Sequence, residues 1–227
     1  ARAMEDLHLE RFNAGDHLGA VAEVARAESI SRVLYPADST EAGQELRLRQ
    51  EYFFVAASLQ DLLRRHRNTH TSVLTLGDHA AIQLNDTHPS IAVAELMRQL
   101  VDVYDVAWDA AWQVTVDTLS YTNHTLLPEA LETWPVGLME RMLPRHMQII
   151  YLINAQHIDS LRAKGIHDFD VLRAVSLIEE DNGRRVRMGN LAFLGSHSVN
   201  GVSGLHTQLM RKTVFSELHK LYPERIH

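Results

Sequence analysis

Two short stretches of this chain place polar side chains where strands are expected to end. In the stretch 120–132, an asparagine, a histidine and two glutamates lie around one expected strand end, at Asn123, His124, Glu129 and Glu132. Upstream, the apolar run Ala80–Leu84 is broken by Asn-Asp-Thr-His at positions 85–88. Because ligands of open parallel α/β sheets bind beyond the carboxyl ends of the strands, we interpret both stretches as parts of a ligand site.

Each of these signals also has a purely structural explanation. Asp86 can cap the helix that follows it, and a histidine such as His124 is more often a hydrogen-bonded core residue than a ligand contact. Glu129 and Glu132 can form a solvated first turn, which the helix dipole favours. The glycines around Asn200 can serve the turn of the backbone alone, since Asn-Gly tolerates positive φ. The residues by themselves therefore leave both interpretations open.

Metal chemistry and the common cofactor motifs are not indicated. His66 and His70 have the i, i+4 spacing of a metal-binding pair, but Arg64, Arg65 and Arg67 beside them would repel a cation. We therefore expect no metal site. The chain contains no G-x-G-x-x-G, Walker, G-x-S-x-G or H-E-x-x-H motif.

The composition is that of an ordinary globular protein. Its 227 residues carry a formal charge of -7, and 45% of them are hydrophobic, so a sizeable core is expected in one large domain or two small ones. The negative charge argues against a nucleic-acid partner. With no cysteine, the chain has no disulfide framework and no thiolate nucleophile, which fits a cytoplasmic location.

The sequence also argues against membrane association. No apolar stretch approaches the roughly 20 residues of a membrane span. The start at Ala1 shows no signal-peptide core. Since it also has no initiator methionine, we expect the chain to be a fragment of a longer protein.

Helical periodicity covers most of the chain. Apolar residues recur at steps of three and four in several windows, which is the signature of amphipathic helices. We expect helices through Leu18, Val21 and Val24 to about Tyr35, through Leu48 and Leu63 to about Arg65, from Pro89 through Tyr104, over Trp108–Thr118, from Pro135, from Pro144 to Lys164, and in two final segments. A proline favours the first turn of a helix, and Gly165 supplies a stop.

Short apolar runs between the helices are expected to be strands. Ala80–Leu84 and Val175–Ile178 are two of them, and the turn 181–183 follows the second. Strands that alternate with helices favour parallel pairing in a layered domain. We therefore predict an α/β fold with a short parallel sheet flanked by helices.

Longer strings in the chain resemble the glycogen, starch and maltodextrin phosphorylases, which form the α-glucan phosphorylase family. The resembling strings lie at Ile30–Pro36, Glu45–Phe53, Ile82–Ser90, Tyr121–Thr125, Pro128–Glu132, Leu143–His146, Gln148–Ile150 and Val199–Val202. Essentially the whole chain is covered. The short segment between Arg67 and Gly77 is typical of bacterial members.

The resemblance implies a homodimeric enzyme of the GT-B type, with two Rossmann-like domains facing a cleft. Such enzymes remove the terminal glucosyl unit of an α-1,4-glucan with inorganic phosphate and release glucose 1-phosphate with retention. Residues 1–227 resemble the latter half of the first domain. The cofactor, pyridoxal phosphate, is held by a lysine of the second domain, and no lysine here lies in a similar segment. We therefore expect no bound cofactor and no activity in this chain alone.

The resemblance also assigns roles to single residues. His124 is similar to the histidine that hydrogen-bonds the primary hydroxyl of the sugar, and whose backbone carbonyl stabilises positive charge developing at the anomeric carbon. Asp86 and His88 resemble residues that line the cleft beside the sugar. The turn Asn200-Gly201-Val202 resembles one that packs near the glucose, where small residues permit close approach.

Two further acidic residues belong to the expected substrate site. Glu132 is expected among the substrate-binding groups, and Asp38 resembles an acidic residue on a loop that gates the site. Family members often have asparagine on both sides of that aspartate, whereas this chain has Ala37 and Ser39. The position of the gate is thus expected here, but its contacts are not defined by the resemblance.

Two other classes of function remain open at this level. A pair of carboxylates among Asp38, Asp86, Glu129 and Glu132 is what a glycoside hydrolase requires, with water in place of phosphate as the acceptor. Alternatively, the chain is a glucan-binding or assembly module without catalysis. The identity of the product distinguishes the three, because only phosphorolysis yields glucose 1-phosphate.

Overall fold

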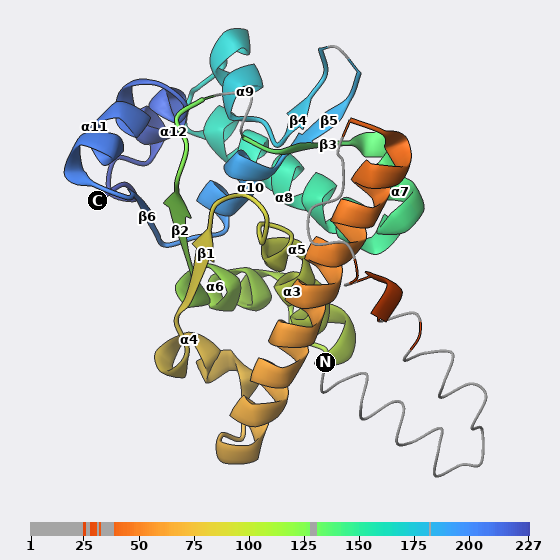
Figure 1. The fold of residues 1–227 in the computed structure, drawn as a ribbon. Helices are drawn as coiled ribbons and strands as arrows, with labels where there is room; N and C mark the ends of the chain where they lie inside the picture. Colours follow the sequence, from red (N-terminus) through yellow and green to blue (C-terminus); the bar gives the residue numbers. More distant parts are fainter. Residues whose placement is uncertain (1–24, 26–27, 31, 33–38, 128–130, 182) are drawn as a thin grey trace, which may run out of the picture. The chain divides into compact units, whose positions relative to one another are not determined.

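The computed structural model describes residues 25, 28–30, 32, 39–127, 131–181 and 183–227 (Figure 1). The chain divides into two compact units, Ala1–Thr71 and Ser72–His227. The helix expected through Leu18, Val21 and Val24 falls outside the described residues. Among the described residues, no helix is both long and apolar enough to cross a lipid bilayer.

A single long helix, α3 (Glu41–Thr69), dominates the described part of the first unit. The hydroxyl of Thr40 accepts a hydrogen bond from the Gly43 backbone N–H at 3.1 Å and caps the amino end. Residues shielded from solvent recur at helical spacing along it, at Leu48, Val55, Leu59, Leu63 and His66. The helix predicted through Leu48 and Leu63 is confirmed, and it continues beyond the expected end near Arg65 to Thr69.

The second unit alternates helices with short strands. Its elements are η1 (Val73–Thr75), α4 (Leu76–His79), β1 (Ile82–Asn85), α5 (Ala92–Arg98), η2 (Gln99–Val103), α6 (Trp108–Thr118), β2 (Leu119–Asn123), β3 (Thr133–Pro135), α7 (Val136–Met142), α8 (Pro144–Ala163), α9 (Phe169–Val175), β4 (Ile178–Glu179), β5 (Arg185–Arg187), α10 (Met188–Leu194), β6 (Ser198–Gly201), α11 (Gly204–Lys212) and α12 (Ser216–Leu221).

The predicted parallel sheet is confirmed. Its strand order is β1-β2-β6, with Leu84 opposite Tyr121 and Tyr121 opposite Val199. These three side chains are at most 2% exposed, and helices α6 and α10 contact β2 while α11 contacts β6 (Figure 1). The chain is thus an α/β structure whose short parallel sheet is flanked by helices.

A second sheet, which the sequence pattern does not reveal, is antiparallel. It has the order β3-β5-β4, with Trp134 and Ile178 both opposite Val186. The predicted strand Val175–Ile178 was therefore wrong in extent. Val175 ends α9, and only Ile178 belongs to a strand. A short apolar run has no period of its own, so it does not distinguish a helix end from a buried strand.

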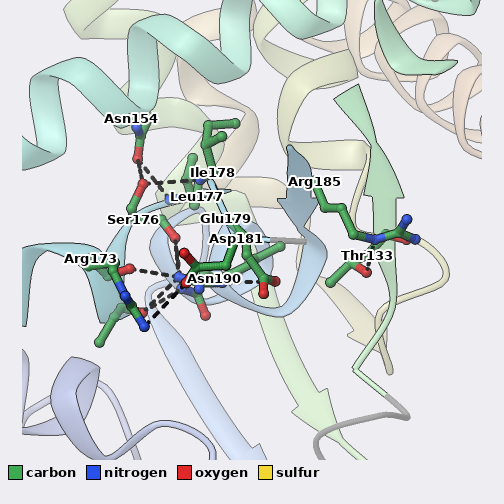
Figure 2. A network of polar contacts seen from close by, with 12 residues as sticks. Thr133, Asn154, Arg173, Ser176, Leu177, Ile178, Glu179, Asp181, Arg185 and Asn190 are labelled. Carbon is green, nitrogen blue, oxygen red and sulfur yellow. Dashed lines mark hydrogen bonds and ion pairs between the residues drawn. The ribbon is translucent and has the colours of Figure 1, made fainter. Parts of the chain in front are cut away.

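Side chains from β5 and α10 bind the backbone at the carboxyl end of α9, which stops at Val175 (Figure 2). The guanidinium of Arg187 donates to the Arg173 carbonyl at 2.7 Å, and the Asn190 amide donates to the carbonyls of Ala174 and Ser176 at 3.2 and 3.1 Å. These carbonyls have no partner within the helix. The backbone N–H of Leu177, next in the chain, donates to the Asn154 side chain of α8 at 2.7 Å.

Other helix boundaries differ from the sequence predictions in detail. Pro144 is the first residue of α8, as predicted, and Gly165 has the positive φ of 85° expected of a stop. Pro135 instead ends β3 and precedes the first turn of α7. The helix after Pro89 begins at Ala92, and its last five residues, Gln99–Val103, form a π-helix.

A charged cluster lies in the core of the second unit. Glu95 of α5 is fully buried and accepts hydrogen bonds from Arg98, Gln99 and His146, the last at 2.6 Å from α8. Burial alone would raise the pKa of Glu95, but these hydrogen bonds outweigh burial and lower the pKa to about 2. The carboxylate is therefore charged at neutral pH and joins α5 to α8.

A buried neutral histidine lies at the other end of α8. His157 is 7% exposed, and its Nδ1 lies 3.2 Å from the Tyr222 hydroxyl. Burial, and then the charges of Arg225 and Lys164, lower the pKa of His157 from 6.5 to about 4. Among the described residues its Nε2 has no hydrogen-bond partner.

This histidine predicts a loss of stability in mild acid. Between pH 6.5 and 4 the unfolded chain binds a proton at His157 and the folded chain does not, so the free energy of unfolding should fall by about 3 kcal/mol over that range and change little from this group above it. Urea unfolding followed by tryptophan fluorescence measures this, because Trp108, Trp112 and Trp134 all lie in the second unit. His157→Phe should flatten the slope, and exposed His167→Phe should keep it. A slope that survives in His157→Phe would contradict the assignment.

The close packing of α11 on β6 predicts a second effect. A Cβ at Gly201 would lie 2.5 Å from the His206 ring and 2.9 Å from the Thr207 backbone N. Gly201→Ala should therefore lower the free energy of unfolding by about 1–3 kcal/mol. Gly204→Ala, at the start of the facing helix α11, is the matched control, since a Cβ there meets nothing within 4 Å. Equal melting temperatures for the two variants would refute the packing argument.

Candidate functional site

The ends of the parallel strands carry the residues that the sequence singles out. After β1, Asp86 adopts a positive φ of 63°, which few residue types other than glycine tolerate. Its backbone N–H donates to the Thr122 carbonyl at 2.8 Å, and its carboxylate accepts from the Thr87 N–H at 3.1 Å. The chain is thus turned sharply at the sheet edge, with the strain typical of functional loops.

His124 lies beside this turn. It follows the last residue of β2, is exposed, and its Nε2 lies 3.4 Å from the Asn85 side-chain oxygen at the end of β1. The parallel register of β1 and β2 is what brings the two strand ends together. The two polar stretches predicted from the sequence therefore do meet, through Asn85 of the first and His124 of the second.

His88 and Glu132 form a second part of the same edge. The Nδ1 of His88 lies 3.6 Å from a carboxylate oxygen of Glu132, and the side chain of His88 is 53% exposed against 10% for Glu132. The Glu132 backbone N–H reaches the hydroxyl of fully buried Thr87 at 3.4 Å. Thr87 thus links the β1 loop to the segment that precedes β3, which no spacing in the sequence indicates.

At the end of β6, the side chain of Asn200 forms hydrogen bonds within the protein. The Asn200 amide accepts from the Thr122 hydroxyl at 3.0 Å and donates to the Gly201 carbonyl at 2.9 Å. Gln83 in turn donates to Thr122 at 2.7 Å, so a row of hydrogen bonds crosses all three strands. Val202 beyond the turn is 56% exposed. Of this predicted trio, Asn200 supports the sheet and Val202 faces solvent.

A buried polar chain underlies the ends of β2 and β6. Asn123 is fully buried, its amide nitrogen donates to the Tyr121 hydroxyl at 3.2 Å, and its oxygen lies 2.9 Å from His206 Nε2 of α11. Burial raises the pKa of the Tyr121 phenol, although the bond from Asn123 opposes this. Sequence reasoning missed His206, because it lies 83 residues from its partner.

Together these groups offer several hydrogen-bond donors and acceptors at one edge of the sheet. The carboxylates of Asp86 and Glu132 accept hydrogen bonds, and the histidines can donate or accept. Such a set suits a ligand rich in hydroxyl groups. Asp38 and Glu129, which the sequence also nominated, lie outside the described residues.

The chain is similar over its whole length to known proteins. The family described as carbohydrate phosphorylase matches residues 1–227. The chain is 50% identical to the liver form of glycogen phosphorylase from Bos taurus and 49% identical to the brain form from Homo sapiens. It is 52% identical to a glycogen phosphorylase from Haemophilus influenzae.

Each alignment covers 99% of this chain, but only 27% or 28% of the relative. The chain therefore spans little more than a quarter of the length of these proteins. The family match extends over residues 1–227, which include every strand end described above. The chain belongs to the carbohydrate phosphorylase family.

Proposed function

We propose that this chain is part of an α-1,4-glucan phosphorylase, and that it supplies the sugar-facing side of the active-site cleft. The parent enzyme would transfer the terminal glucosyl unit of the glucan to inorganic phosphate and release glucose 1-phosphate. The observation that carries the proposal is the contact of His124 with Asn85 at the carboxyl edge of the parallel sheet, in a chain of this family. On this view residues 1–227 are the second half of the amino-terminal domain of a cytoplasmic homodimer.

The geometry supports distinct roles for the residues at the edge. His124 is exposed at a strand end, where its ring can bond a sugar hydroxyl and its backbone carbonyl can stabilise positive charge at the anomeric carbon. Asp86 and the His88–Glu132 pair can accept and exchange hydroxyl protons on the β1 side. Buried Gly201 and exposed Val202 lie at the end of β6, which pairs with β2 on the side away from β1.

The residues of this chain do not fit a pyridoxal phosphate site. A Schiff base requires a lysine whose amine is free and desolvated. The three lysines are all exposed: Lys220 pairs with Glu217 at 2.6 Å, Lys164 lies over the Tyr222 ring, and Lys212 ends α11. We therefore propose that the cofactor of the parent enzyme is held by residues outside this chain.

Removing the His124 side chain should slow the parent enzyme. In the full-length protein, His124→Ala should lower kcat/KM. The loss should correspond to about 2 to 4 kcal/mol of transition-state stabilisation, the range for one lost transition-state hydrogen bond. Release of glucose 1-phosphate from maltodextrin and phosphate measures this. His88→Ala should have a smaller effect, because its ring is half exposed and tied to Glu132.

His197→Ala provides a matched control for the His124 variant. His197 is an exposed histidine beside the same strand, but its ring contacts the Val116 carbonyl and Ser120, near the opposite end of β2. This variant should retain the activity of the unmodified enzyme. Normal turnover in a folded His124→Ala enzyme would remove His124 from the site.

The isolated chain should be inactive. Residues 1–227 alone should release no glucose 1-phosphate and should bind no pyridoxal phosphate through a Schiff base, because none of their lysines is suited to it. Borohydride reduction followed by peptide mapping tests the second point. Stoichiometric labelling of one lysine would contradict it.

Product analysis of the full-length parent tests the proposed reaction itself. Glucose 1-phosphate formed in step with phosphate consumption supports phosphorolysis. Free glucose formed without phosphate would indicate hydrolysis, and glucan binding without turnover would indicate a binding module.

A further inference from the structure

His206 of α11 is the only described side chain that reaches Asn123, the last residue of β2, from outside the sheet. The distance from its Nε2 to the Asn123 oxygen is 2.9 Å. Both Asn123 and Tyr121, to which Asn123 donates, are fully buried. A missing partner here would leave a buried polar group unsatisfied, which is costly.

The direction of these hydrogen bonds determines which ring nitrogen of His206 carries a hydrogen. The Asn123 amide nitrogen donates to the Tyr121 hydroxyl, so its oxygen must accept. His206 therefore carries a hydrogen on Nε2. Both the neutral tautomer of that kind and the imidazolium carry it, so the contact does not require a charge.

The same ring also touches the end of β6. Gly201 pairs with Asn123 in register, and the site of its absent Cβ lies 2.5 Å from a ring carbon of His206. The amino end of α11 is fixed in turn, because the Ser203 hydroxyl accepts from the His206 backbone N–H at 3.2 Å. His206 thus holds together the strand end before His124 and the turn before Val202.

We propose that His206 is a positioning residue of the sugar site. Through Asn123 it sets the position of the His124 backbone and ring relative to the turn 200–202, without touching the ligand itself. This inference rests on the proposed function. It adds a residue from α11 to a site otherwise built from the loops after the parallel strands.

Two substitutions separate the hydrogen bond from the bulk of the ring. In the full-length enzyme, His206→Gln retains an amide N–H near the position of Nε2, whereas His206→Asn is one methylene too short to reach Asn123. His206→Leu removes the donor and keeps an apolar side chain of similar size. The assay is the release of glucose 1-phosphate from maltodextrin and phosphate, with kcat and KM determined separately.

We expect kcat to fall about tenfold in the Asn and Leu variants with little change in KM, and to remain within about threefold of the unmodified enzyme in the Gln variant. In a His124→Ala background, His206→Asn should cause less than about a threefold further loss, because it acts through His124. A residue that only stabilised the fold would reduce activity equally in both backgrounds.

The outcomes distinguish the two proposals. If the unmodified enzyme releases no glucose 1-phosphate, the proposed function fails, and this inference fails with it. If the unmodified enzyme does release glucose 1-phosphate, two results would overturn only the inference. One is a folded His206→Asn enzyme with the same kcat as the unmodified enzyme. The other is a double variant with His124→Ala in which the losses of kcat from the two substitutions multiply. Thermal melting identifies variants that do not fold, and if Leu does not fold, the comparison of Asn with Gln decides.

Discussion

Hydrogen bonding of β2 on both sides is the constraint on which the site depends. As the central strand, β2 fixes Asn85 opposite Thr122 and Asn123 opposite Gly201. A slip of one residue would turn each of its side chains to the other face. Tyr121 would then leave the core, and Thr122 would lose both Gln83 and Asn200. The register that buries the core is thus the one that places His124 beside Asn85.

The buried charge of Glu95 extends this constraint to the helix after β1. Taking a carboxylate out of water costs several kcal/mol, and the three donors around Glu95 offset that cost. Since α5 follows directly on the loop that contains Asp86 and His88, the bond to His146 also determines where that loop ends. A second contact joins α8 to η2, where the Arg145 guanidinium donates two hydrogen bonds to the Asp102 carboxylate, at 2.8 and 2.7 Å.

The sequence predicted what depends on local pattern. The amphipathic steps of α3, α6 and α8 and the apolar run of β1 each lie within one segment, and the observed elements agree closely with them. The polar residues after β1 and β2 were also located correctly at strand ends. Their meeting follows from a general property of parallel sheets.

What was missed depends on contacts between distant segments. The antiparallel sheet pairs β3 with β5, some fifty residues apart, as the Arg185 bond to Thr133 shows in Figure 2. Nor does any pattern indicate that Asn200 turns to Thr122, or that His206 reaches Asn123. Short polar side chains have several possible partners, and only the folded chain selects among them.

The capping of α9 has a consequence for the order in which the protein folds. A helix of seven residues is far below the length at which helices persist in water. Its last carbonyls are satisfied by Arg187 and Asn190, which come later in the chain. The helix can therefore become stable only once β5 and α10 have docked against it. During synthesis, α9 must wait for residues that leave the ribosome after it, and the segment 169–190 should assemble as one cooperative step.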